Sequence, residues 1–310
     1  MNTAPQHDDA FLLVSFGGPE GPEEVRPFLE RVVAGRGVPP ARLAEAARHY
    51  DLFGGVSPIN ARNRALVAAL RDRLAEPPLR MRAYWGNRYS RPTIEDAVRA
   101  MRDDGVRRAR AFVTSAFDSP AGFSRYRDAI AAARAGLGPG APVVEVLPPF
   151  WDHPLFERAQ AAVLRQGLSG TRGRTRVVFT AHSIPVAMAG ACSYDADLAT
   201  ACGRAARASG VADWVLAYQS RSGRPSEAWL GPDIGAALAR AASAGIDTAV
   251  VCPIGFVTDQ MEVRYDLDVE AASQAEARGL AFVRCPTADR DPAFVEMIVA
   301  MTANDPLVAA

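Results

Sequence analysis

Short apolar runs rich in branched and aromatic residues alternate with amphipathic stretches along the whole chain. The amphipathic stretches, such as IEDAVRAMRDDG and DIGAALARAASAG, have helical periodicity. The apolar runs predict eight buried strands, at 11–16, 81–86, 109–117, 143–148, 176–184, 214–219, 248–255 and 281–286. Because strands and helices alternate, the pattern predicts parallel sheets covered by helices on both faces.

Four strands fall in each half of the chain. This predicts an α/β fold of two similar Rossmann-like domains, 1–150 and 151–310, each a four-stranded parallel sheet flanked by helices. The segments RAYWGNRYSRP (82–92) and LAYQSRSGRP (216–225) precede similar helix and strand signals. That internal echo indicates a duplicated unit with a cleft between the copies. The amphipathic run 292–302 is expected to be a helix that packs back on the first domain.

Composition and charge exclude several classes of protein. The 310 residues contain 35 basic and 35 acidic side chains, so no net basic charge favours nucleic acid as a partner. The apolar runs are too short to cross a membrane, and the polar start MNTAPQHDDA is unlike a signal peptide. Cys192, Cys202, Cys252 and Cys285 form no tight pair, which favours a reduced, cytoplasmic setting.

Two strands are each followed by a side chain capable of binding metal. His182 lies in FTAHSIP (179–185), and Glu262 lies in CPIGFVTDQMEVRYDLDVE (252–270). In an open parallel sheet, ligands bind at the carboxyl edge, where both side chains would then lie. An imidazole and a carboxylate facing one crevice can bind a divalent ion, move protons, or do both. The alternative for His182 is a histidine satisfied by hydrogen bonds at a strand end.

Acidic residues recur every four positions in the second segment. Glu262, Asp266 and Glu270 drift by only about 40° per step on a regular helix, so they form one stripe. A wider π-type turn would align them more closely, and such turns favour functional sites. Asp266 and Glu270 could then lead a hydrated cation inward. A solvated helix face is the alternative.

Two glycine-containing loops in the first half offer polar groups to a ligand. Gly17 and Gly18 follow the first strand but do not form GxGxxG, so we reject a dinucleotide site. Tyr50 and Ser57, in YDLFGGVSPIN (50–60), and Tyr126 provide hydroxyls for the anionic edge of a ligand, unless these loops are ordinary turns.

Taken together, these segments resemble the ferrochelatase family nearly end to end. The resemblance is carried by LLVSFGGPEGPEEVRPFLERV, YDLFGGVSPIN, YWGNR, EDAVRAMRDDGVRRARAFVTSAF, TAHSIP and GFVTDQMEVRYDLD. The motifs SFGGPEGP and TSAF are most similar to the actinobacterial branch, which is associated with coproporphyrin III. The resemblance implies two similar domains with the active site in the cleft between them. It also implies insertion of Fe²⁺ into coproporphyrin III, giving coproheme on the way to heme b.

The resemblance also implies a role for individual residues. His182 and Glu262 would be catalytic, with Glu262 facing His182 across the macrocycle from a separate half of the molecule. His182, Glu262, Asp266 and Glu270 would contact the metal. The residues implied to contact the porphyrin are Phe16, Arg36, Tyr50, Ser57 and Tyr126. Phe16 stands where other members have a tyrosine near the iron, so no phenolate is expected there.

The expected reaction needs no cofactor, because Fe²⁺ is a substrate. A 2Fe-2S cluster, which some members carry, is not expected, since the ending TANDPLVAA has no cysteine group. We expect a monomer that makes transient contact with neighbouring heme-pathway enzymes. Gln260 departs from the family pattern D-H-x-E, which keeps open a non-catalytic porphyrin- or heme-binding protein. A related chelatase that inserts cobalt or nickel into another tetrapyrrole is the third interpretation.

Overall fold

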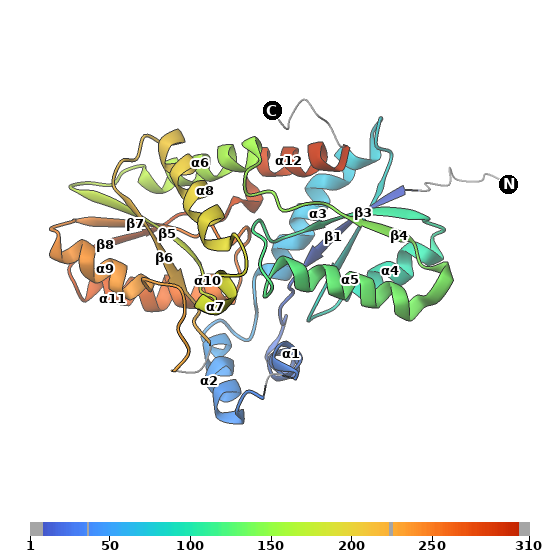
Figure 1. The fold of residues 1–310 in the computed structure, drawn as a ribbon, viewed down its shortest axis with the longest axis horizontal. Helices are drawn as coiled ribbons and strands as arrows, with labels where there is room; N and C mark the ends of the chain where they lie inside the picture. Colours follow the sequence, from blue (N-terminus) through green and yellow to red (C-terminus); the bar gives the residue numbers. More distant parts are fainter. Residues whose placement is uncertain (1–8, 36, 223–225, 304–310) are drawn as a thin grey trace. The chain divides into compact units, whose positions relative to one another are not determined.

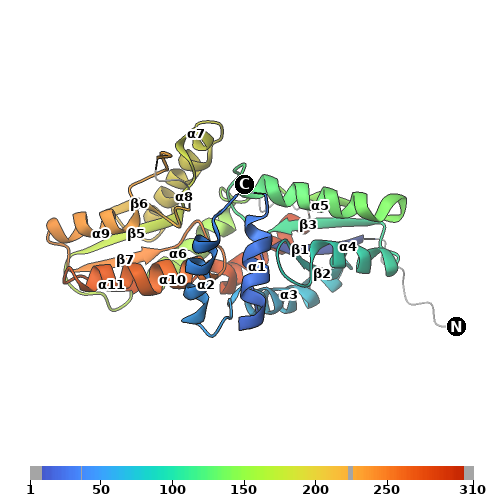
Figure 2. The same ribbon diagram turned by 90° about the horizontal axis from the view of Figure 1, so that it is seen from below.

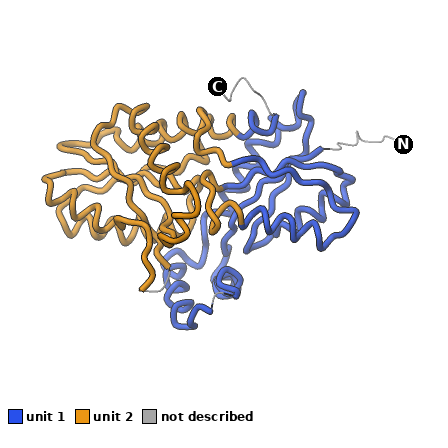
Figure 3. Tube along the Cα trace, in the orientation of Figure 1, with its two compact units in different colours: residues 1–114, 125–148, 298–305 blue, residues 115–124, 149–297, 306–310 orange. Residues whose placement is uncertain are grey.

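The computed structural model describes residues 9–35, 37–222 and 226–303. These residues form two compact units, shown in Figure 3. Unit 1 contains the described residues up to 114, together with 125–148 and 298–303. Unit 2 contains 115–124 and 149–297.

Unit 1 is built on a four-stranded parallel sheet with strand order β2-β1-β3-β4. Its strands are β1 (Asp9–Ser15), β2 (Arg82–Asn87), β3 (Arg108–Val113) and β4 (Val143–Val146). The helices that begin between Pro22 and Phe123 are α1 (Pro22–Val33), α2 (Pro40–Asp51), α3 (Ile59–Ala75), α4 (Ile94–Asp103) and α5 (Phe123–Leu137), with the short turn η1 (Gly138–Gly140) after them. β1 is a central strand buried on both faces, as its unbroken apolar run predicts.

Unit 2 repeats this plan with strand order β6-β5-β7-β8, again all parallel (Figure 1). Its strands are β5 (Thr175–His182), β6 (Trp214–Gln219), β7 (Thr248–Cys252) and β8 (Ala281–Arg284). The helical segments after Pro149 are α6 (Pro154–Leu168), α7 (Val186–Ala189), α8 (Tyr194–Ala208), α9 (Ile234–Ser243), α10 (Met261–Tyr265), the π-helix η2 (Asp266–Ala271), α11 (Ala272–Glu276), η3 (Ala288–Arg290) and α12 (Pro292–Ala303). α6 packs against α8, and α9 packs against α11 and η2 (Figure 2).

The predicted fold class is confirmed, and so is the internal echo. In both sheets the first strand is central and the second lies at one edge. The second strand then leads into a loop in which Asn87 N–H donates to the Pro92 carbonyl, and Tyr218 N–H donates to the Pro232 carbonyl, each at 2.8 Å. Each loop ends at a residue that caps the next helix, Thr93 in one unit and Asp233 in the other.

All eight predicted strands are present, but several end earlier than predicted. β7 stops at Cys252 and β8 stops at Arg284, because Pro253 and Pro286 follow closely and proline cannot donate to a sheet ladder. β3 stops at Val113, and residues 115–124 belong to unit 2. The terminal helix α12 is present, and its second half, 298–303, belongs to unit 1. Within the described residues, no helix is both long and apolar enough to cross a membrane.

Candidate functional site

The carboxyl edge of the unit 2 sheet carries the imidazole that the sequence singled out. His182 is the last residue of β5, the strand between β6 and β7. Its Nδ1 lies 2.5 Å from the Ser183 carbonyl oxygen. A carbonyl only accepts hydrogen bonds, so in the neutral ring Nδ1 carries the proton. Nε2 therefore has a free lone pair, which can take a proton or bind a metal ion.

The carboxylate of Glu262 lies beside that nitrogen. Glu262 Oε1 is 3.6 Å from His182 Nε2, and the two side chains are 43% and 34% exposed, respectively. Its other oxygen, Oε2, accepts a hydrogen bond of 3.2 Å from the Gln260 amide. The Glu262 backbone carbonyl accepts a 2.8 Å hydrogen bond from Gln219, at the end of β6. Gln260 thus holds the carboxylate and Gln219 holds its backbone, while the side chain remains accessible.

This geometry corrects one expectation. Glu262 and His182 do not face each other across a macrocycle from separate halves of the molecule, because both belong to unit 2 and their side chains adjoin. The reason is that β5 and the segment after β7 end at the same edge of one parallel sheet. The two groups can therefore act together on one ion or one proton.

The environment of His182 favours its protonated form. Burial by itself lowers the pKa of His182, but the net shift is upward because the Glu262 carboxylate, the Ser183 carbonyl and Asp266 all stabilise the imidazolium. The neutral ring is the form that accepts a proton. Activity that depends on it is therefore lost as the pH falls through this raised pKa.

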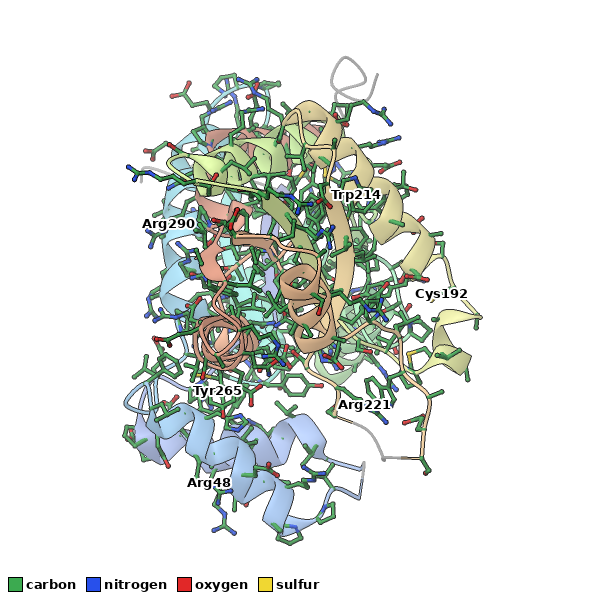
Figure 4. All side chains as sticks on the ribbon, turned by 90° about the vertical axis from the view of Figure 1, so that its left-hand side faces the viewer. Arg48, Cys192, Trp214, Arg221, Tyr265 and Arg290 are labelled. Carbon is green, nitrogen blue, oxygen red and sulfur yellow. The ribbon has the colours of Figure 1, made fainter. Side chains whose placement is uncertain are left out.

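Asp266 and Glu270 of the acidic row lie on a π-helix, and Glu262 lies on α10 just before it. η2 spans Asp266–Ala271, and Tyr265, labelled in Figure 4, is the residue just before it. Val263, Leu267 and Ala271 also recur every four residues, and all three are buried in the core of unit 2. A π-turn, with i→i+5 hydrogen bonds, reverses the drift of a regular helix and keeps both rows aligned.

Asp266 is the acidic residue of the row with the most altered environment. It accepts hydrogen bonds from the Ser220 hydroxyl and, at 3.5 Å, from Gln219. Burial raises the pKa of Asp266 to about 7, with a further upward contribution from Glu262 and Glu270 and an opposing one from Ser220. Glu270 is exposed at the far end of the row. Among the described residues, no three His, Cys, Asp or Glu side chains form a ready-made metal cage.

We expect Asp266→Asn to stabilise the protein at neutral pH. A carboxyl whose folded-state pKa is about 7, against about 3.9 unfolded, makes stability fall as the pH rises between those values. Asparagine has no carboxyl to ionise, so the variant does not lose this stability as the pH rises. At pH 8 its melting temperature should therefore be about 2–4 °C above that of the parent. Thermal unfolding from pH 5 to 8 checks this. Asp268→Asn, which breaks an ion pair instead, should lower the melting temperature, and a lower value for Asp266→Asn would contradict the prediction.

Three contributors to this edge were missed by sequence reasoning. Gln219 is the last residue of β6 and Ser220 follows it; they bind Glu262 and Asp266, and Ser220 has φ +61°. The Tyr194 hydroxyl donates to the His182 carbonyl at 3.0 Å. The strand-end position that identified His182 would also have identified Gln219, but an amide side chain does not titrate, so it was not considered as a catalytic group.

The predicted porphyrin contacts lie in unit 1, and an aromatic cluster connects most of them. Phe16 packs edge-on against Tyr89 and Phe28, and Phe28 packs against Tyr50. The Arg88 guanidinium lies 4.6 Å from the Tyr89 ring centroid and 5.0 Å from that of Tyr126, the remaining tyrosine that the sequence singled out.

Ser57 stands apart from this cluster. Ser57 is buried against the Gly17–Gly18 turn, and a Cβ at Gly18 would come within 2.5 Å of the Ser57 Cβ. The double glycine is therefore needed for close packing. Arg36 lies outside the described residues.

Comparison with solved structures identifies the fold. The chain superposes with a TM-score of 0.57 on the sirohydrochlorin chelatase SirB from Bacillus subtilis subspecies spizizenii in complex with cobalt. The match covers 97% of this chain and 98% of that one at 12% identity. SirB from Bacillus subtilis with Fe³⁺ matches with a TM-score of 0.59, also at 12% identity, over 97% of this chain and 98% of that one. The fold is thus the two-sheet fold of chelatases.

Sequence comparison then identifies the family. Residues 8–305 match the ferrochelatase family model, and the chain belongs to the ferrochelatase family. It is 49% identical to the coproporphyrin III ferrochelatase of Mycobacterium tuberculosis, over 93% of this chain and 83% of that protein. It is 47% identical to the ferrochelatase of Rhodopirellula baltica, over 96% of this chain and 86% of that protein.

Proposed function

We propose that this protein inserts Fe²⁺ into coproporphyrin III and so forms coproheme for heme b synthesis. The observation that carries the proposal is the approach of His182 Nε2 to Glu262 Oε1, 3.6 Å, at the ligand-binding edge of a parallel sheet. The Mycobacterium tuberculosis relative, 49% identical, is named a coproporphyrin III ferrochelatase, which supports this porphyrin as the substrate.

Metallation exchanges two pyrrole N–H protons for one ferrous ion. His182 Nε2 accepts one pyrrole proton, passes it to solvent and then accepts the second, and the adjacent Glu262 carboxylate stabilises the imidazolium that forms each time. In the neutral state of His182, the same nitrogen and carboxylate hold Fe²⁺ before transfer. With two protein ligands the ion is held weakly enough to be released into the ring. Asp266 and Glu270 supply the ion along the π-helix.

The macrocycle is held by unit 1 residues in this proposal. Phe16 contributes an apolar face, since it carries no phenolate. Tyr50, Ser57, Tyr126 and Arg36 bind the propionates, whose four negative charges distinguish coproporphyrin from less charged porphyrins. Contacts at the periphery can offset the cost of bending the ring toward the geometry that accepts a metal.

The proposal extends to the remaining properties of the protein. It acts in the cytoplasm as a monomer, without a 2Fe-2S cluster, and passes coproheme to a neighbouring heme-pathway enzyme through transient contact. The cysteines support the absence of a cluster, because Cys252 and Cys285 lie within hydrogen-bond reach of each other but two thiols do not supply the four ligands that a 2Fe-2S cluster needs. Iron and sulfide analysis of the purified protein tests the cluster, and sedimentation tests the monomer.

The decisive experiment mixes the purified protein with coproporphyrin III and Fe²⁺ without oxygen. The free-base absorption spectrum should convert to that of the metalloporphyrin at least about a hundredfold faster than without protein. Protoporphyrin IX should react more slowly, because it has two propionates instead of four. Binding of coproporphyrin III without acceleration would favour a heme-handling protein. Preference for Co²⁺ or Ni²⁺ with another tetrapyrrole would favour a different chelatase.

A further inference from the structure

An arginine at the end of β8 joins two acidic residues that flank the candidate site. Arg284 Nε lies 2.5 Å from Asp268 Oδ1, and its two terminal nitrogens lie 3.3 Å from Asp268 Oδ2 and 3.0 Å from Asp259 Oδ1. The three side chains are only 17%, 26% and 14% exposed, in the order Arg284, Asp268, Asp259. A planar guanidinium that binds one carboxylate with two bonds and a second with one fixes both in direction as well as distance.

In the sequence, Asp259 and Asp268 lie on either side of the two candidate site residues Glu262 and Asp266. Asp259 precedes Glu262 by three residues, and Asp268 follows Asp266 by two. Asp268 is part of the π-helix η2, so the guanidinium holds both the loop before α10 and the helix after it. The segment that carries Glu262 and Asp266 is therefore fastened on both sides of its functional side chains.

The same segment is held from the opposite edge of the sheet. Gln219 and Ser220, at the end of β6, bind the Glu262 carbonyl and the Asp266 carboxylate. β6 and β8 are the two outer strands of the unit 2 sheet, and β5, which carries His182, lies between them. Segment 259–268 is thus attached to both outer strands of the sheet. Arg284, at the end of β8, binds its two ends, and the end of β6 binds its middle.

A buried polar network supports the β8 attachment. The Thr287 hydroxyl donates to Asp289 at 2.8 Å and lies 3.3 Å from Asp259 Oδ1. The Thr258 hydroxyl donates to the other oxygen of Asp289 at 3.0 Å. Because Asp259 is held by this network as well as by Arg284, the loop leading into Glu262 has little freedom to shift.

We propose that Arg284 is a positioning residue for metal insertion: it holds segment 259–268 so that the Glu262 carboxylate stays beside His182 Nε2. This inference rests on the proposed function, because Glu262 is its point of action. A purely structural role for Arg284 would lower stability without changing the chemistry of the folded protein. Turnover measured on folded protein distinguishes the two roles, because only a positioning role lowers it.

The test compares Arg284→Lys and Arg284→Met with a matched control. Arg176→Met removes an equivalent fork, in which Arg176 binds Asp213 with bonds of 2.7 and 3.1 Å at the start of β5, the far end of the sheet from His182. Arg284→Lys should lower kcat for Fe²⁺ insertion about tenfold and Arg284→Met about a hundredfold, with the Kd for coproporphyrin III within twofold of the parent. Arg176→Met should lose stability and keep kcat.

A double-variant cycle identifies the residue through which Arg284 acts. In the Glu262→Gln background, Arg284→Lys should lower kcat by less than twofold further, because the group it positions is already disabled. A full tenfold further loss would overturn the proposal, as would an unchanged kcat in folded Arg284→Lys. If Arg284→Met does not fold, Asp268→Asn replaces it, with the same expected loss of kcat.

A metal-binding measurement separates this proposal from the proposed function. If the wild-type protein does not metallate coproporphyrin III, the proposed function fails, and Co²⁺ affinity followed by visible absorption decides the role of Arg284. Arg284→Lys should then weaken Co²⁺ binding at least about fivefold relative to Arg176→Met, since a displaced carboxylate is a poorer ligand. Equal affinities would overturn the positioning role.

Discussion

The His182→Ala variant should metallate coproporphyrin III about 10³-fold more slowly than the parent while binding the porphyrin with nearly unchanged affinity. Nε2 is the one imidazole lone pair at this sheet edge among the described residues, because Nδ1 is committed to the Ser183 carbonyl. Its loss removes both the proton acceptor and a ligand of the incoming ion. Removal of a positioned general base costs about 10²–10⁴-fold, and a loss of about 10³-fold lies in the middle of that range.

Stopped-flow absorption under anaerobic conditions measures the rate, and fluorescence quenching measures porphyrin binding. His153→Ala is the matched control. His153 caps α6, its Nδ1 accepting from the Leu155 amide at 3.1 Å, so its loss should lower stability by about 1 kcal/mol without affecting turnover. A His182→Ala rate within fivefold of the parent would show that the imidazole is only a satisfied strand-end residue.

Strand ends were the most predictable part of this site. Residues 177–181 before His182 are buried, and a parallel sheet brings the ends of such strands to one edge, so the pattern alone predicts that His182 and Glu262 lie at the same edge. The spacing of Glu262, Asp266 and Glu270 predicted one aligned row on either a regular helix or a π-turn, and the structure contains the π-turn. Local periodicity and strand order are sufficient to predict the row and the sheet edge, but not the π-turn.

Side-chain pairing over long separations could not be predicted in the same way. Arg284 is 16 residues from Asp268 and 25 from Asp259, and many other Arg–Asp pairs would satisfy the same composition. The choice among them depends on which carboxylates come within reach of the guanidinium once the strands and helices have packed. The prediction that His182 and Glu262 face each other across a macrocycle was wrong for a related reason. The direction in which a side chain points depends on the conformation of the loop that carries it.

The Glu262→Gln variant should lose about 10²-fold in kcat. The replacement keeps the volume, and its side-chain oxygen can still accept from the Gln260 amide, which now contacts Oε2 at 3.2 Å. It removes the negative charge that stabilises both the His182 imidazolium and Fe²⁺. Glu276→Gln, an exposed change on α11, is the matched control and should leave turnover unchanged.

The pH dependence gives this variant a signature that simple damage would not produce. Burial lowers the pKa of His182 and the Glu262 charge raises it, so loss of that charge must move the pKa downward. Proton acceptance requires the neutral ring, and the acidic limb of kcat/KM should therefore shift to lower pH in Glu262→Gln, although the maximal rate falls. Rate profiles from pH 5 to 8 measure the shift. A limb that stays in place, or moves to higher pH, would mean that Glu262 does not act on His182, and the pair would then have to be assigned separate roles.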